Sequence, residues 1–300
     1  MKILIGVDAG ASHTTAAVAN EHGTVLVRSD GAPGAMRPGA AAAVAARILE
    51  TCGDALRKAE REVRGDVLVV GAAGVGREEE RLALQAALED TDLAPRVAVI
   101  VDGAIALQAA FSDAPGVVLL AGTGSIAWAR LPGGATTRIG GLGAVMGDQG
   151  SGYDLARQAL RAAGLAIEGR GRRTLLASRL LKRLHLSGLP ELVRWAATAD
   201  AAAVAALAPE ALAAAEEGDA VASALVDAGA DDLASHVRAV AERFPRDAEV
   251  GVALGGSLLS RNDDYRKRVV ARIVADVPSA HIRAEPVDPV LGAIQLARAL

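Results

Sequence analysis

The stretch Ile3-Leu4-Ile5-Gly6-Val7-Asp8-Ala9-Gly10-Ala11-Ser12-His13-Thr14-Thr15 decides the fold, because an apolar strand runs directly into a turn of small residues. Small residues let the backbone approach an anion closely, and successive peptide amides in such a turn form an anion-binding nest. We therefore predict a phosphate-binding turn formed by Gly10, Ala11, Ser12, His13 and Thr14. The Asp8 carboxylate ends the strand where it can hold Mg²⁺ or its waters. The alternative is an ordinary hairpin turn with a solvated aspartate.

Composition narrows the class of protein. Of the 300 residues, 51% are hydrophobic but only 2% are aromatic, so the core must consist of Ala, Val, Leu and Ile, which suits parallel strands covered by helices. The length allows two lobes with separate cores. A formal net charge of −4 supplies no basic field for a polyanion, and so few aromatic residues offer no stacking platform for bases. We therefore expect no nucleic-acid partner.

The single cysteine and the N-terminus indicate the compartment. Cys52 is the one cysteine of the chain, so no internal disulfide, thiolate zinc site or cysteine-held iron–sulfur cluster can form. No signal-peptide pattern precedes Asp8, and no apolar stretch reaches the length of a membrane span. We expect a cytoplasmic protein without a membrane partner.

The order of strands and helices predicts an internal repeat. Three strands, a helix, a strand, a helix and a strand are expected in that order at residues 3–7, 14–19, 25–29, 40–60, 66–70, 77–89 and 97–101. After a helix near residue 104, strands return at residues 117–120, 125–131 and 136–139. Residues 152–244 are rich in Ala and Leu and predict helices, and a strand, a helix, a short strand and a last helix follow at residues 249–254, 263–275, 281–283 and from 289. A β-β-β-α-β-α unit present twice, with a helical insertion in its second copy, explains this order.

A second turn of small residues stands in the matching place of the second repeat. Leu119-Leu120-Ala121 leads into Gly122, Thr123, Gly124 and Ser125. If the repeats face each other, both turns can bind the phosphates of one nucleotide. Thr123 can then also contact the substrate that receives the phosphate. The alternative is a tight hairpin.

Asp102 is the candidate catalytic base. It follows the strand at residues 97–101 and precedes a helix, so it lies at the carboxyl end of a strand, where open α/β sheets place their ligands. In phosphoryl transfer one carboxylate orients and deprotonates the attacking hydroxyl. An aspartate in this place can instead cap the helix that follows it.

Glycine-rich segments predict the remaining parts of the site. The loop 140–152 surrounds the carboxylate of Asp148 with glycines, and we expect Gly140, Gly141, Gly143 and Asp148 to bind substrate, a flexible linker being the alternative. Strand 249–254 ends in Gly255, Gly256 and Ser257, a geometry suited to an adenine or ribose. Gly74 either lines the same site or turns the chain. The five histidines lack metal-ligand spacing, and we interpret them as surface or locally hydrogen-bonded residues.

The chain resembles the N-acetylglucosamine kinase branch of the actin/hexokinase/Hsp70 superfamily, the BadF/BadG/BcrA/BcrD-type ATPase family. Five motifs carry the resemblance in order: Asp8-x-Gly-x-Ser-x-Thr14, Asp102-Gly103, Gly122-Thr123-Gly124-Ser125, Gly147-Asp148-Gln149-Gly150-Ser151-Gly152 and Gly255-Gly256. It implies an α/β fold of two ribonuclease-H-like, actin-like lobes with mixed sheets. The implied lobes are residues 1–113 with 286–300, and residues 114–285 with a helical insertion at about 153–245.

The resemblance also implies roles for the motif residues. Asp8 would manage Mg²⁺, the two turns would hold the phosphates of ATP, and Gly255-Gly256 would border adenosine. Asp102 matches the catalytic base of the family, and Asp148 matches its ligand for a sugar hydroxyl. The family further implies a homodimer.

Two departures bear on the acceptor. Gln149 stands where the family usually has glutamate, which removes a charge but keeps a polar contact, and residues 31–37 lack the asparagine usual in sugar kinases of the family. Lysine is common where this chain has His13.

Three hypotheses follow from the sequence. The first is an ATP-dependent kinase for an amino sugar, N-acetylglucosamine or glucosamine, or for a related hexose. The second is a nucleotide-binding ATPase that regulates a partner and phosphorylates no sugar. The third is an inactive homologue, against which the retention of Asp8, Asp102 and Asp148 argues.

Overall fold

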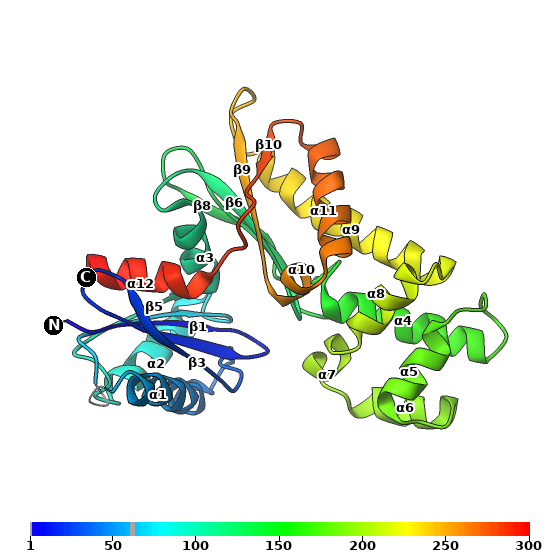
Figure 1. The fold of residues 1–300 in the computed structure, drawn as a ribbon, viewed down its shortest axis with the longest axis horizontal. Coiled ribbons are helices and arrows are strands. Elements are labelled where there is room, and N and C mark those ends of the chain that lie inside the picture. The colour runs from blue at the N-terminus through cyan, green and yellow to red at the C-terminus, as the bar shows by residue number, and fades with distance from the viewer. Residues whose placement is uncertain (1, 61–63) are drawn as a thin grey trace. The chain divides into compact units, whose positions relative to one another are not determined.

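A computed structural model describes residues 2–60 and 64–300, and the chain divides into two compact units. The first unit is Met1–Ala114 together with Val287–Leu300, and the second is Pro115–Pro286. Within the described residues, each unit contains one five-stranded sheet with both parallel and antiparallel strands. The two units are therefore described in turn (Figure 1).

The sheet of the first unit has the strand order β3-β2-β1-β4-β5. Its strands are β1 (Leu4–Ala9), β2 (Thr14–Ala19), β3 (Val25–Gly31), β4 (Val67–Ala72) and β5 (Arg96–Val101). The meander β1-β2-β3 is antiparallel, whereas β1, β4 and β5 run parallel. Asp8 lies opposite Gly71, and Gly71 lies opposite Ile100. The carboxyl ends of the three parallel strands therefore meet at one edge of the sheet.

Helices cover both faces of this sheet. Helices α1 (Ala41–Lys58) and α2 (Glu78–Glu89) pack on one face, and α3 (Asp102–Phe111) and α12 (Pro289–Ala299) pack on the other (Figure 1). Alternation along β1 sends Ile5 and Val7 toward the first pair and Leu4 toward the second. Helix α12, at the far end of the chain, thus covers the first strand.

Glycine allows α12 to pack this closely. A Cβ atom on Gly292 would lie 1.9 Å from the carbonyl oxygen of Ile105 in α3, and one on Gly6 of β1 would lie 2.9 Å from the peptide nitrogen of Ile294. Any larger residue at either position would push α12 away from its neighbours.

The second unit repeats the connectivity of the first. Its sheet has the order β10-β9-β6-β7-β8, which read backwards matches the first sheet. The strands are β6 (Gly116–Ala121), β7 (Ser125–Arg130), β8 (Thr136–Gly140), β9 (Val250–Gly255) and β10 (Ala280–Ile282). Strands β6, β7 and β8 form the antiparallel meander, and β6, β9 and β10 run parallel. The predicted duplication is confirmed.

A helical insertion separates β8 from β9. It comprises α4 (Gly152–Ile167), α5 (Leu176–Leu184), α6 (Leu189–Thr198), α7 (Ala201–Ala205), α8 (Ala208–Glu216) and α9 (Ala220–Ala241). The short helix α10 (Ser257–Arg261) and helix α11 (Asp263–Asp276) follow β9. The predicted α/β fold class, with mixed sheets and helices inserted in the second lobe, is confirmed. Within residues 2–60 and 64–300, no helix is both long and apolar enough to cross a bilayer.

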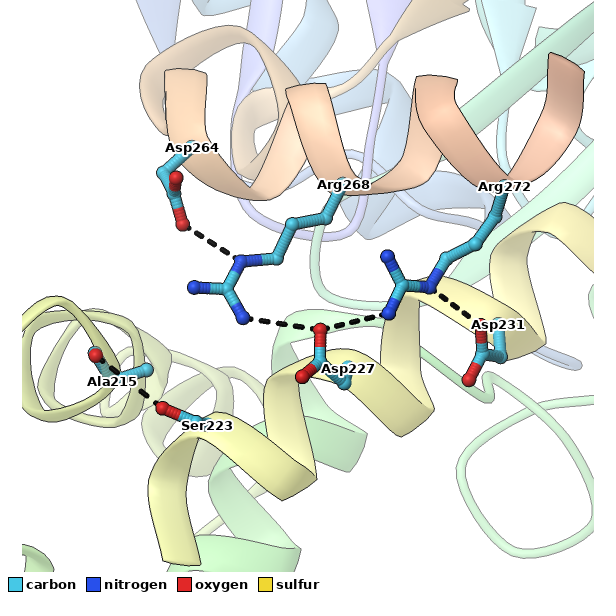
Figure 2. Close-up of polar contacts among 7 residues, drawn as sticks. All are labelled: Ala215, Ser223, Asp227, Asp231, Asp264, Arg268 and Arg272. Carbon is cyan, nitrogen blue, oxygen red and sulfur yellow. Dashed lines mark hydrogen bonds and ion pairs between the residues drawn. The ribbon is translucent and has the colours of Figure 1, made fainter. Parts of the chain in front are cut away.

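Ion pairs join α9 to α11 (Figure 2). One oxygen of Asp227 on α9 accepts from Arg268 at 3.1 Å and from Arg272 at 2.8 Å, both on α11. The same two arginines also bind Asp264 and Asp231. Single exposed pairs contribute little, but a shared carboxylate joining two arginines fixes the register of the helices.

Candidate functional site

The first predicted turn connects β1 to β2 at the edge where the parallel strands end. The Gly10 N–H donates to the His13 carbonyl at 3.0 Å and closes the turn. The Gly10 carbonyl accepts from Gly34 at 3.0 Å and from Ala35 at 3.1 Å. The segment 31–37, which sequence reasoning singled out for the acceptor, therefore lies directly on this turn. The side chains of residues 11–13 are exposed, which leaves this part of the turn accessible to an anion.

The side chain of Thr14 lies in the interior of the first unit. Its side chain is fully buried, and its hydroxyl donates to the Ala32 carbonyl at 2.7 Å. This hydroxyl was predicted to donate a hydrogen bond to a phosphate, but in the structure it donates to the segment 31–37. The first residue of β2 points inward, which the sequence pattern of the turn did not indicate.

Gly74 also holds this segment. It has a φ angle of +84°, and a Cβ atom there would lie 2.1 Å from the Met36 carbonyl oxygen. The Met36 N–H donates to the Ala73 carbonyl at 2.8 Å. Of the two roles considered for Gly74, the structure displays the turn, packed against the segment 31–37.

Three carboxylates gather near the carboxyl ends of β1 and β5. Burial, followed by the negative charges of Asp102 and Asp288, raises the pKa of Asp8 to about 7. Asp288 precedes α12 and forms an ion pair with Arg28 at 2.6 Å. Among the described residues no cluster of three or more His, Cys, Asp or Glu side chains is arranged to hold a metal ion. A cation here would need ligands beyond the protein, such as phosphate oxygens and water.

Asp102 begins α3, directly after β5. The Gly103 N–H donates to Asp102 Oδ1 at 2.8 Å, so the carboxylate binds the first turn of its own helix. In the sheet, β4 separates β1 from β5, and its residue between Asp8 and Ile100 is Gly71. Asp102 is the first residue of α3 and Val101 is the N-cap, with no side-chain cap hydrogen bond, so the strand-end position expected of a base is present without the capping geometry.

The second predicted turn connects β6 to β7 and sits on the N-terminus of α4. The Gly122 carbonyl accepts from Gly152 at 2.8 Å, and the Thr123 carbonyl accepts from Tyr153 at 3.2 Å. The first amides of α4 are thus satisfied by this turn. The Gly122 N–H closes the turn on the Gly124 carbonyl at 2.9 Å.

The glycine turn after β9 lies beside it. Gly256 has a φ angle of +87°, and a Cβ atom there would lie 2.3 Å from the Ala121 carbonyl oxygen. A Cβ on Gly122 would meet the Ser257 hydroxyl oxygen at 3.4 Å. The structure therefore brings together the two segments that sequence reasoning assigned to the phosphates and to adenosine.

Asp148 is fixed against the start of β7. The Ser125 N–H donates to Asp148 Oδ1 at 3.2 Å, and the buried Ser125 hydroxyl donates to the Gln149 carbonyl at 2.7 Å. A Cβ atom on Gly124 would lie 2.7 Å from the Asp148 carboxylate. Burial raises the pKa of Asp148, against the opposing effects of the Ser125 N–H and of His236. Ser125 was predicted to bind phosphate, but in the structure it positions Asp148, the residue predicted to bind the sugar.

Two residues that sequence reasoning missed bind the backbone of Gly150. The Tyr265 hydroxyl donates to the Gly150 carbonyl at 2.7 Å, and the Gly150 N–H donates to Asp154 Oδ2 at 3.2 Å. Tyr265 and Asp154 are both buried. A Cβ atom on Gly150 would lie 2.3 Å from the Gly229 carbonyl oxygen. Helix α9 therefore also packs closely against the backbone of Gly150. The spacing of Ser151 and Asp154 is that of a capping box, and Ser151 caps α4 by accepting from the Asp154 N–H at 3.2 Å, so this spacing could have indicated Asp154, whereas no signal near residue 150 points to Tyr265.

The remaining glycines of the loop differ in their surroundings. Gly140, Gly141 and Gly143 have φ angles of +80°, +65° and +81°. Gly140 lies against the His236 ring, whereas a Cβ atom on Gly143 would have, beyond its chain neighbours, no atom of the described residues within 4 Å. The apolar side chains between Gly143 and Asp148 that face solvent are Val145 and Met146.

Two sheets of the same strand order, each with a small-residue turn after its first strand, define a two-lobed α/β protein of the actin-like ATPase class. Residues 5–297 match the model of the BadF/BadG/BcrA/BcrD ATPase family, and the chain belongs to that family.

Two relatives and one solved structure match this chain over almost its full length. An N-acetylmuramic acid/N-acetylglucosamine kinase of Clostridium acetobutylicum is 26% identical, with 99% of each chain covered. An N-acetyl-D-glucosamine kinase of Dictyostelium discoideum is 27% identical, over 99% of this chain and 98% of the relative. A solved structure from Chromobacterium violaceum, described as a candidate N-acetylglucosamine kinase, superposes with a TM-score of 0.85 at 26% identity and 99% coverage of both chains.

Proposed function

We propose that this chain is an ATP-dependent kinase that transfers the γ-phosphate of ATP to a hydroxyl of an amino sugar, N-acetylglucosamine or glucosamine. The observation that carries the proposal is the placement of Asp8 and Asp102 at the carboxyl ends of β1 and β5, near enough for the charge of one to raise the pKa of the other. Relatives named as kinases of N-acetylated amino sugars support the acceptor class.

Each carboxylate has a separate role in this proposal. The attacking sugar hydroxyl gives its proton to Asp102 as its oxygen bonds to the γ-phosphorus and the bond to the β-phosphate oxygen breaks, releasing ADP. Asp148 accepts a hydrogen bond from another hydroxyl of the sugar and orients it. The turns at residues 10–13 and 122–124 contact the phosphates through backbone amides, whose dipoles offset the negative charge of the transferring group.

The residues around Asp8 fit a divalent cation bound together with ATP. Three carboxylates lie near one another, and among them Asp288 is paired with Arg28. A cation at Asp8 would offset the desolvation cost that burial imposes on its carboxylate and the repulsion from Asp102 and Asp288. Mg²⁺ would supply positive charge to the phosphate oxygens, and ATP and water would complete its ligands.

The test is sugar-dependent release of ADP. N-acetylglucosamine, glucosamine, N-acetylmuramic acid and glucose are each offered with Mg·ATP, and the phosphorylated product is identified by mass spectrometry. We expect an amino sugar to raise turnover well above basal hydrolysis, and Asp102→Asn to lower kcat by about 10²–10⁴-fold. Asp113→Asn, on an exposed residue beyond α3, is the matched control and should leave kcat unchanged.

One result would count against the kinase, and another would count against Asp102 as its base. If no sugar raises ADP release above the basal rate, the chain is better described as a nucleotide-hydrolysing regulator. If Asp102→Asn phosphorylates sugar as fast as the wild type, the carboxylate of Asp102 only binds the adjacent Gly103 N–H and another group is the base.

A further inference from the structure

His236, on α9, is a buried residue with one ring nitrogen committed to the protein. Its side chain is 6% exposed, and Nδ1 lies 2.7 Å from the carbonyl oxygen of Asp232, four residues earlier on the same helix. A carbonyl oxygen only accepts hydrogen bonds, so Nδ1 carries a hydrogen. In the neutral ring Nε2 is then left with its lone pair as an acceptor.

The Nε2 edge of the ring faces the loop of the proposed sugar site. A Cβ atom on Gly140 would lie 2.5 Å from the His236 Cδ2 atom and 2.6 Å from Nε2. Glycine at the end of β8 therefore lets the backbone lie close to this edge of the ring, where the side chain of any larger residue would collide with it. Within residues 2–60 and 64–300, His236 Nε2 has no hydrogen-bond partner. Among the described residues Nε2 is not one of the fully buried atoms that lack a partner, so it stays accessible to water or to a bound donor.

Asp148 and His236 lie at the same end of β7 and β8. Ser125, the first residue of β7, donates its N–H to Asp148, and its carbonyl accepts from Gly141 at 3.0 Å. Gly140, the neighbour of Gly141, lies against His236. A positive charge on His236 would lower the pKa of Asp148, which places the two side chains within electrostatic reach of each other.

Ion pairs connect the elements behind these side chains. His236 comes from α9, the Gly150 carbonyl accepts from Tyr265 of α11, and Asp227 of α9 pairs with Arg268 and Arg272 of α11 (Figure 2). Preorganised polar groups on rigid elements discriminate between ligands better than groups on mobile loops do.

We propose that His236 is a substrate-binding residue that sets specificity: its Nε2 atom accepts a hydrogen bond from an N–H or O–H donor of the sugar held at Asp148. The inference rests on the proposed kinase function and deepens it. A sugar that lacks the donor would displace water from Nε2 without replacing its hydrogen bond, and such a sugar should bind less tightly.

The test compares three variants for the KM of the sugar and of ATP. His236→Leu removes the acceptor, His236→Gln keeps an acceptor oxygen at similar reach, and His236→Asn keeps one on a shorter side chain. We expect His236→Leu and His236→Asn to raise the sugar KM about tenfold, the equivalent of about 1.4 kcal/mol. We expect His236→Gln to remain within about threefold of wild type and all three to keep the KM for ATP. Far-UV circular dichroism and thermal unfolding verify folding, and His236→Asn replaces His236→Leu if the latter does not fold.

Substrate analogues identify the donor. Sugars that lack the acetamido N–H or one hydroxyl at a time are assayed with wild type and with His236→Leu. The analogue lacking the bonded donor should cost the wild type about tenfold in kcat/KM and cost His236→Leu almost nothing, because the acceptor is already gone.

The outcomes separate this inference from the function on which it rests. A wild-type chain that phosphorylates no sugar refutes the kinase and this inference together. A wild-type kinase whose sugar KM stays within twofold in His236→Leu, or whose KM for ATP rises equally, refutes the inference alone. In that case His236 is a core histidine satisfied by its bond to Asp232.

Discussion

Replacing Asp8 by asparagine is expected to stabilise the ligand-free protein while abolishing its activity. Burial, and after it the charges of Asp102 and Asp288, raise the pKa of Asp8 from 3.8 to about 7. Each pKa unit between the unfolded and folded states corresponds to about 1.4 kcal/mol. Above pH 7, the ionised carboxylate therefore costs the folded protein up to about 4 kcal/mol, which Asp8→Asn removes.

The pH dependence has a definite sign. Between pH 3.8 and about 7 the folded protein binds the proton more tightly than the unfolded chain, so stability falls as pH rises through this window. The cost is absent below 3.8 and complete above about 7. From pH 5 to pH 8 the stability of wild type relative to Asp8→Asn should therefore fall by about 3 kcal/mol.

Urea unfolding at pH 5 and pH 8, with a chelator and no nucleotide, measures this difference. Far-UV circular dichroism follows both units, and hydrogen exchange of peptides from β1 and β4 reports on the first unit by itself. Asp113→Asn is the control for loss of an exposed charge. An advantage of Asp8→Asn that is equal at the two pH values, or absent at pH 8, would refute the reasoning. Mg²⁺ with ADP should stabilise wild type at pH 8 more than the variant.

Two further substitutions test the packing around the proposed site. Tyr265→Phe removes the hydrogen bond to the Gly150 carbonyl and should lower the free energy of unfolding by about 1–2 kcal/mol; it should also raise the sugar KM more than the ATP KM, and equal changes in both would contradict the positioning role. Gly292→Ala places a methyl group 1.9 Å from the Ile105 carbonyl oxygen and should destabilise the first unit by about 1–3 kcal/mol in urea unfolding. Gly164→Ala, a helical glycine whose nearest neighbour is 4.0 Å away, is the matched control and should be neutral or stabilising.

The strands and helices were predictable because their signals are local. The apolar run before Asp8, the small-residue turns and the Ala-rich segments each determine structure over ten to twenty residues, and the order of these elements repeats. Repetition of a weak local signal in matched places is itself informative, which is why the turn at Gly122 strengthened the interpretation of the turn at Gly10. The resemblance to a family added the expected roles.

The directions of side chains at the turns were not predictable in this way. Thr14 and Ser125 each begin the strand after a turn, and both have their hydroxyl groups in the protein interior. Which face of a strand a residue occupies depends on register, and one residue of slip reverses it. A hydroxyl in a glycine-rich motif therefore does not identify a ligand contact.

The supporting residues were hidden because their contacts span long stretches of chain. Tyr265 reaches Gly150 across 115 residues, and Asp288 acts on Asp8 from the opposite end of the sequence. No periodicity or spacing encodes such contacts. The sequence indicates surface or locally hydrogen-bonded histidines, and the bond of His236 to Asp232 agrees with the second of these, but the surroundings of its other ring nitrogen are evident only from the structure.

The position of α12 has a consequence for biosynthesis. This helix covers the face of β1 that carries Leu4 and Gly6, yet about 170 residues of the second unit are translated between the rest of the first unit and α12. At roughly 5–20 residues per second, the ribosome takes about 10–30 s to make them. During that time the nascent first unit exposes an apolar face to chaperones and to neighbouring chains. The unit that is started first is thus completed last.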